Sequence, residues 1–232
     1  MRRVFVPILA GGTLRDRMIA CVGALFGIGV TALVSWYLLY PTGSLLAIVA
    51  PMGASAVLVF AVPASPLAQP WPVVGGNVIS ALVGIGIARV VPVPELAAGL
   101  AVAGAILAMS LTRSLHPPGG AAALTAVIGG PAIASAGYAF AFVPVGVNAV
   151  ILAAMGAAFH RFSGHSYPHR PVPVAGHVIP PGVPHPEDID LALADLGETF
   201  DIAREDLDLL FQRVEHHAMR RRVGAGPGGP TG

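Results

Sequence analysis

Two proline- and glycine-containing segments in the most apolar part of the chain have the residue types of a small-anion site. Pro51-Met52-Gly53-Ala54-Ser55 and, 66 positions later, Pro117-Pro118-Gly119-Gly120-Ala121 each interrupt a helical pattern and begin a new one. Proline is tolerated in the first turn of a helix because the first backbone N–H groups have no partner within the helix. Each segment therefore predicts a helix N-terminus, whose N–H donors and positive dipole end favour an anion.

The predicted substrate-binding residues lie in the first turns of these two helices. They are Gly53, Ala54, Ser55, Gly119, Gly120 and Ala121. The alternative interpretation is that small residues only allow transmembrane helices to approach closely. That alternative suits any single glycine or alanine well, but the pair of breaks taken together favours a binding site.

Four polar residues near the breaks have predicted supporting roles. Arg113 and His116 are candidates for gating or coupling, because intramembrane charge is costly and histidine titrates near neutral pH. Alternatively, Arg113 lies in a cytoplasmic loop and His116 anchors the break through hydrogen bonds. Asn77 and Asn148 occupy corresponding places in two predicted spans, where an amide more often links helices than contacts a ligand.

Composition places the chain in the membrane class. Hydrophobic residues make up 55% of its 232 residues, the mean hydropathy is +0.75, and only 11% are charged, whereas soluble domains have about 25% charged residues. Between Met18 and His160 the charged residues are Arg89, Glu95 and Arg113. Residues 18–160 therefore form a predicted integral membrane domain in contact with the lipid bilayer.

The net charge and the cysteine count exclude nucleic acid and a cysteine-based metal site as expected partners. A net charge of +1 gives no bulk attraction to nucleic acid. The lone Cys21 forms no disulfide framework, and His160, His165 and His169 have no cysteine or carboxylate close in sequence. We expect no metal site and no cofactor.

The predicted fold is an all-α membrane protein with six transmembrane segments. Arginines lie before the first segment and after the last, so the positive-inside rule places both termini in the cytoplasm and requires an even number of crossings. Six segments divide into two triplets, each with a broken second helix. Because three is odd, the second triplet begins on the opposite side, which predicts two inverted repeats, as in many secondary transporters.

The remaining segments complete the predicted organisation. Residues 1–17 form a cytoplasmic lead-in and residues 161–185 a linker rich in proline and histidine. Residues 186–222 form a short cytoplasmic helical tail, because apolar residues recur there at helical spacing. Residues 223–232 are predicted to be disordered.

The chain resembles the HPP family, which is named for a His-Pro-Pro triplet. Four blocks carry the resemblance, which covers roughly residues 15–160: residues 51–58, 66–70, 75–82 and 116–124. The resemblance implies an integral membrane protein with a transport function, and plastid and cyanobacterial members are associated with nitrite. Family descriptions usually count four spans, so a count of six departs from them. Many bacterial members continue into nucleotide-sensing CBS modules, which we do not expect in this chain.

The sequence thus favours transport of a small inorganic anion, with nitrite as one candidate. We expect the protein in a bacterial inner membrane, where a homo-oligomer is compatible with the sequence. The alternative is a membrane anchor or sensor for a C-terminal regulatory module outside this chain. An enzyme is not expected, because the apolar domain offers no acidic partner for His116 and no placed nucleophile.

Overall fold

A computed structural model describes residues 13–39, 48–170, 186–196 and 201–224. The predicted lead-in up to residue 12, the linker from residue 171 and the predicted disorder from residue 225 lie outside the described residues. The chain divides into two compact units, Met1–His169 and Arg170–Gly232, each of which is described by itself.

All secondary-structure elements in the described part of the first unit are helices. Its elements are α1 (Leu14–Leu39), α2 (Pro51–Ala61), the 3-10 turn η2 (Pro66–Ala68), the π-helix η3 (Pro72–Gly76), α3 (Asn77–Val90), α4 (Pro94–Leu111), α5 (Pro117–Ile128), α6 (Pro131–Ala136), the π-helix η4 (Ala141–Gly146) and α7 (Val147–Ser163). Among the described residues, four helices are long and apolar enough to cross a membrane, namely Leu14–Leu38, Pro72–Val90, Pro94–Leu111 and Ala141–Ser163. The prediction of an all-helical membrane protein is therefore confirmed, while the count of six crossings stays a prediction.

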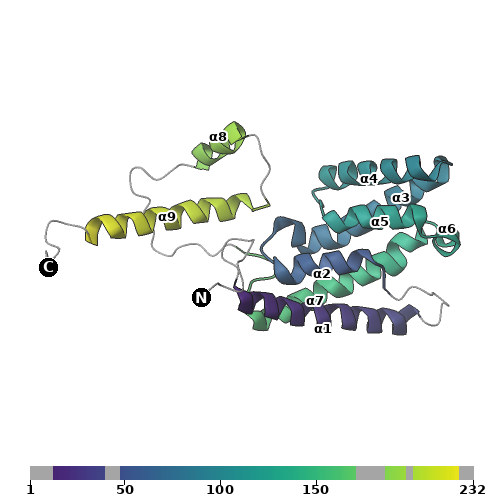
Figure 1. Ribbon diagram of the computed structural model, residues 1–232, viewed down its shortest axis with the longest axis horizontal. Coiled ribbons are helices and arrows are strands. Elements are labelled where there is room, and N and C mark those ends of the chain that lie inside the picture. Colours follow the sequence, from purple (N-terminus) through teal and green to yellow (C-terminus); the bar gives the residue numbers. More distant parts are fainter. Residues whose placement is uncertain (1–12, 40–47, 171–185, 197–200, 225–232) are drawn as a thin grey trace, which may run out of the picture. The chain divides into compact units, whose positions relative to one another are not determined.

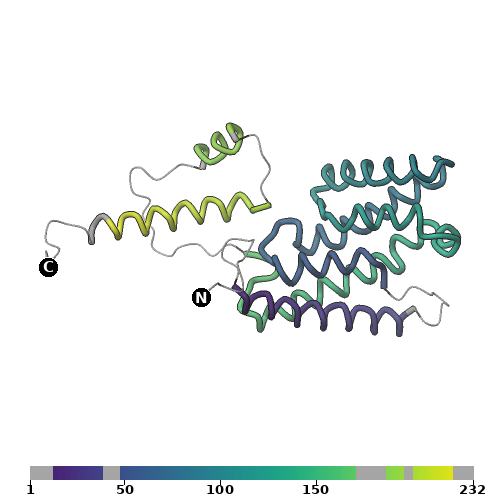
Figure 2. The backbone as a smooth tube through the Cα atoms, viewed as in Figure 1, coloured from purple at the N-terminus to yellow at the C-terminus, as the bar shows by residue number. Residues whose placement is uncertain are grey.

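Helices α2 and α5 are the two short apolar helices, with 11 and 12 residues. Each begins with proline at its first position, as the sequence predicts. Between α4 and α5 the chain leaves the helical path (Figure 2), and His116 there has extended backbone angles. The residue before a proline is disfavoured in the helical conformation, which explains why the break falls at this position.

Successive helices of the first unit reverse direction (Figure 1). The guanidinium Nη1 of Arg17, at the start of α1, donates to the carbonyl oxygen of Ala61 at the end of α2, over 3.0 Å. At the other end of α1, Ser35 accepts a hydrogen bond from Asn148 near the start of α7. The beginning of α1 and the end of α7 therefore lie at the same end of this unit.

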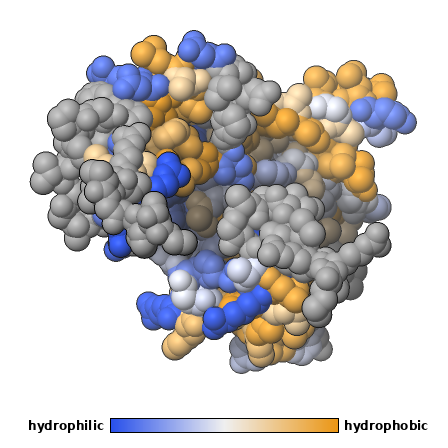
Figure 3. Space-filling model, turned by 60° about the vertical axis from the view of Figure 1, so that its left-hand side comes forward, coloured by the Kyte–Doolittle hydropathy of each residue, from blue (hydrophilic) through white to orange (hydrophobic). Residues whose placement is uncertain are grey.

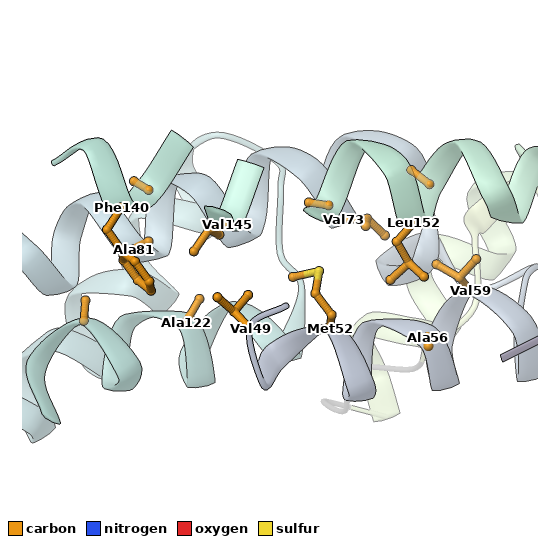
Figure 4. Packing of buried hydrophobic residues seen from close by; sticks show 14 of the residues in the cluster. Val49, Met52, Ala56, Val59, Val73, Ala81, Ala122, Phe140, Val145 and Leu152 are labelled. Atoms are coloured by element: carbon orange, nitrogen blue, oxygen red, sulfur yellow. The ribbon is translucent and has the colours of Figure 1, made fainter. Parts of the chain in front are cut away.

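The core is built from small and medium-sized side chains between helices. Val49 and Met52 at the start of α2 lie beside Ala122 of α5, and Leu152 of α7 lies near Val59 (Figure 4). All five side chains are at most 3% exposed. Small residues at helix contacts let the backbones approach closely. In a bilayer the hydrophobic effect does not drive helices together, so this close packing stabilises their association.

The outer face of the same helices is apolar as well. Leu25, Phe26, Leu107 and Leu111 are each more than half exposed, and hydrophobic residues lie at the surface in Figure 3. A soluble protein rarely exposes so much apolar area, whereas a bilayer covers it. The outward side chains thus agree with contact between these helices and lipid.

The segment after α7 is tied back to the loop between α2 and η3. The hydroxyl of Tyr167 donates to the carbonyl oxygen of Ala68 over 2.9 Å, and the backbone N–H of His169 donates to Oε1 of Gln69 over 2.8 Å. Burial raises the pKa of the Tyr167 hydroxyl above its usual value. The segment around Tyr167 therefore belongs to the membrane unit.

Replacing Tyr167 by phenylalanine is expected to lower the free energy of unfolding by about 1 kcal/mol, the usual net value of one hydrogen bond. Because phenylalanine keeps the ring, the change in melting temperature in detergent reports the loss of the hydroxyl alone. Tyr138→Phe is the control, because Tyr138 is 44% exposed. Equal melting temperatures for Tyr167→Phe and the unaltered protein would contradict the assigned hydrogen bond.

The second unit contains α8 (Pro186–Leu196) and α9 (Arg204–Gly224) among its described residues. Nε of Arg204 and Oδ1 of Asp190 lie 2.6 Å apart and join the two helices. Both side chains remain partly exposed, so this ion pair contributes little to stability.

Candidate functional site

His116 is the centre of a buried polar cluster between the two broken helices. It is the residue before α5 and is fully buried. Its Nδ1 lies 2.8 Å from the carbonyl oxygen of Leu67, and its Nε2 lies 2.8 Å from Oγ of Ser55, in α2. The His116–Ser55 contact directly connects the break before α5 with helix α2.

The partners of His116 determine its tautomer. A carbonyl oxygen only accepts, so Nδ1 carries the hydrogen that is donated to Leu67. In the neutral ring Nε2 is then an acceptor, and the Ser55 hydroxyl donates to it. When the ring is protonated, the same hydroxyl can instead donate to the carbonyl oxygen of Pro51, 3.2 Å away. The cluster therefore has hydrogen-bond partners for His116 in both protonation states.

Asn77 extends the cluster from the first residue of α3. Its Nδ2 donates to the carbonyl oxygen of Val73 over 2.8 Å and to Oγ of Ser55 over 3.3 Å. Ser80 lies on the same face of α3, close to Gly119 of α5, since a Cβ at Gly119 would lie 2.6 Å from Oγ of Ser80. Asn77 and Ser80 are both fully buried.

The predicted binding residues divide between the buried cluster and the surface of the unit. Ser55 and Gly119 are buried and lie within the cluster, Gly120 is half-buried, and Gly53, Ala54 and Ala121 are exposed. A Cβ at Gly53 would meet nothing within 4 Å. The structure thus brings two of the six residues together with His116 and places three of them facing outward.

The first-turn backbone donors of both short helices are already engaged. The N–H groups of Met52 and Gly53 donate to the carbonyl oxygens of Val49 and Ala50, each over 3.0 Å, and the N–H of Gly119 donates to the carbonyl oxygen of His116 over 2.8 Å. Prolines occupy the other early positions and have no N–H to offer. Polar side chains, rather than these backbone groups, therefore supply the cluster's chemistry.

Arg113 and Asn148 lie apart from this cluster. Arg113 is exposed beyond the end of α4, with a positive φ of 53°. Oδ1 of Asn148 accepts from the backbone N–H of Val49 over 2.9 Å, and its Nδ2 donates to Oγ of Ser35 over 2.7 Å. Asn148 therefore links α7 to α1 and to the start of α2.

Sequence reasoning missed Ser80 and the structural role of His160. Ser80 lies three residues after Asn77, a spacing that signals a shared helix face. Nε2 of His160 lies 2.9 Å from the carbonyl oxygen of Val59, and its Nδ1 lies 2.7 Å from Oγ of Ser163. No group of histidine, cysteine and carboxylate side chains that could hold a metal ion occurs among the described residues.

Comparisons with known proteins agree with this architecture. A family model described as the HPP transmembrane region matches residues 10–168. Two proteins of Dictyostelium discoideum, each named only as a transmembrane protein, are similar to the chain. One is 41% identical over 127 residues, covering 52% of this chain and 44% of the relative, and the other is 48% identical over 97 residues, covering 40% and 30%. The chain thus spans less than half the length of either relative, and no solved structure matches it.

Proposed function

The chain belongs to the HPP transmembrane family, and we propose that its membrane domain transports a small inorganic anion, with nitrite as one candidate. The observation that carries the proposal is the 2.8 Å contact between Ser55 and His116, which joins two broken helices inside an apolar domain. Buried polar groups in a membrane domain are costly and commonly mark the path of a solute. Nitrite is suggested only by the resemblance to plastid and cyanobacterial members.

The chemistry of the cluster suits a small anion. The Ser80 hydroxyl can donate a hydrogen bond to such an anion. Protonation of His116 would free the Ser55 hydroxyl as a second donor and add a positive charge beside the start of α5. The dipole of α5 places further positive potential at that point. Ser55 donates to His116, but the other ring nitrogen bonds to the carbonyl oxygen of Leu67 rather than to a carboxylate. We therefore propose binding and movement of the anion without chemical conversion.

The packing of the helices supports an inverted repeat. Helices α2 and α7 run parallel to each other and antiparallel to α1, and helices α5 and α3 have the same relation to α4 (Figure 1). These two packed groups point in opposite directions, and each combines two helices of one consecutive triplet with the third helix of the other. Asn148 and Asn77 follow the π-helices η4 and η3 at corresponding places. We therefore propose six crossings with both termini in the cytoplasm, with α2 and α5 as the two short crossings.

Cysteine labelling at Val93 distinguishes six crossings from four. With six crossings the turn before α4 lies opposite the ends of the domain, whereas with only the four long helices crossing it lies on their side. In a Cys21→Ala background, we expect cysteines at residues 13 and 166 to react from one side of oriented vesicles and a cysteine at residue 93 from the other. Reaction of all three from one side would refute the six-crossing arrangement.

The function is tested with the purified full chain in proteoliposomes. We expect protein-dependent uptake of at least one inorganic anion among nitrite, nitrate and chloride, with formate included as an organic anion of similar size, measured against protein-free vesicles. A membrane anchor or sensor, the alternative function, would move none of them. Absence of uptake for all four anions from vesicles that contain folded protein would reject the transport proposal.

A further inference from the structure

Two buried polar atoms in the cluster have no hydrogen-bond partner among the described residues. They are Oδ1 of Asn77 and Oγ of Ser80. The two side chains lie three residues apart on α3 and are fully buried. Buried polar groups are nearly always paired, with protein or with a bound molecule, so a small molecule that enters beside α3 would find two unused hydrogen-bonding atoms here.

The unpaired state of Ser80 is unusual within this chain. Hydroxyl side chains inside helices commonly donate to the carbonyl oxygen four residues earlier. Thr31, Ser110, Thr112 and Thr125 do so, and Ser55 donates to His116. The Ser80 hydroxyl instead lies against Gly119 in the first turn of α5. Its hydrogen is therefore free to be donated to a ligand.

The Asn77 oxygen restricts what the ligand can be. Because the carbonyl oxygen of Val73 requires a donor, the amide nitrogen of Asn77 must face it, and Oδ1 is left as the free atom. An amide oxygen only accepts hydrogen bonds. A ligand that fits must consequently carry an O–H or N–H hydrogen.

The charges around the cluster argue against a cation as that ligand. The carboxylates of the described part of the membrane unit are Asp16 and Glu95, which lie in the first turns of α1 and α4 and are not buried. A buried cation would therefore have no counter-charge, and the dipole of α5 makes the surroundings more positive. A neutral molecule with both a donor and an acceptor suits the site better.

We infer that the cluster binds a small weak acid in its protonated form, an inference that rests on the proposed transport function. The acid O–H donates to Oδ1 of Asn77, and another oxygen of the acid accepts from the Ser80 hydroxyl. One proton and one anion then move together, so no net charge crosses the membrane. Anions of strong acids, such as nitrate and chloride, have no hydrogen to donate and would set a negative charge against the Asn77 oxygen.

The selectivity of uptake tests this inference directly. In proteoliposomes of the full chain, the protein-dependent uptake of nitrite and formate is expected to be at least tenfold faster than that of nitrate and chloride, with acidification of the vesicle interior. Protein-free vesicles correct for unassisted permeation of the acids. Equal rates for nitrate and nitrite would leave transport standing and overturn the inference, whereas no uptake of any anion would reject both.

Ser80→Ala tests the site with little risk to folding, since the hydroxyl has no partner to lose among the described residues. We expect the KM for nitrite to rise about fivefold, which corresponds to one hydrogen bond of about 1 kcal/mol, with an unchanged or higher melting temperature. Ser110→Ala is the matched control, because Ser110 is exposed and bonded to its own helix. An unchanged KM in Ser80→Ala would show that a water molecule, not the substrate, completes the site.

Discussion

Gly84→Ala is expected to destabilise the membrane unit strongly, although it adds a single methyl group. A Cβ at Gly84, in α3, would collide with the carbonyl oxygen of Ala123 in α5 and would lie 2.9 Å from the Cα of the same residue. Both atoms belong to the backbone of a packed helix and have no rotamer that would relieve the contact. Overpacking of this kind costs about 3 kcal/mol, and we expect a correspondingly large loss of melting temperature in detergent.

Two other glycines provide matched controls for this substitution. At Gly53 and Gly99 an added Cβ would meet nothing within 4 Å. In helix interiors alanine is favoured over glycine by about 1 kcal/mol, so Gly53→Ala and Gly99→Ala are expected to melt at or above the temperature of the unaltered protein. Similar melting of all three variants would show that α3 and α5 are not packed as described.

The contrast between Gly84 and Gly53 shows where sequence reasoning reaches its limit. Composition correctly predicts a helical membrane domain, and the prolines at residues 51 and 117 correctly place the starts of the two short helices. The sequence does not show which face of a helix meets a neighbour, because both the lipid-facing and the packed faces are apolar in a membrane. For that reason residue type alone predicts Gly53 in the binding site. In the structure a Cβ added at Gly53 would meet nothing within 4 Å, so this glycine faces outward.

The site residues illustrate the same limit in a second way. Residue type and position point to Ser55, Asn77 and His116 individually, and the structure brings them together. Their grouping depends on the packing of α5 against both α2 and α3, which no local pattern encodes. The backbone N–H groups that the sequence assigns to anion binding already donate to nearby carbonyl oxygens in short turns at the two proline breaks. These turns depend on the path of the chain, which composition does not show.

His116→Leu is expected to reduce protein-dependent nitrite uptake at least tenfold. The leucine side chain can neither donate to the carbonyl oxygen of Leu67 nor accept from Ser55. The Leu67 carbonyl oxygen loses its side-chain donor in a buried place, and the Ser55 hydroxyl turns to the carbonyl oxygen of Pro51. Because unpaired groups lower stability as well, the uptake is expressed per folded protein, measured by size-exclusion chromatography of the reconstituted sample.

His116→Gln separates the position of the side chain from its charge. Glutamine retains a donor and an acceptor but does not take up a proton, so we expect measurable uptake with a flatter pH dependence. The dependence that remains comes from protonation of the transported acid itself. His160→Gln is the matched control, since His160 is also buried and bonded to a carbonyl oxygen and a serine, but lies at the end of α7. It should lower the melting temperature and leave the pH profile unchanged. Complete loss of uptake in folded His116→Gln would instead identify His116 as an obligatory proton carrier, and an unaltered pH profile would remove it from coupling altogether.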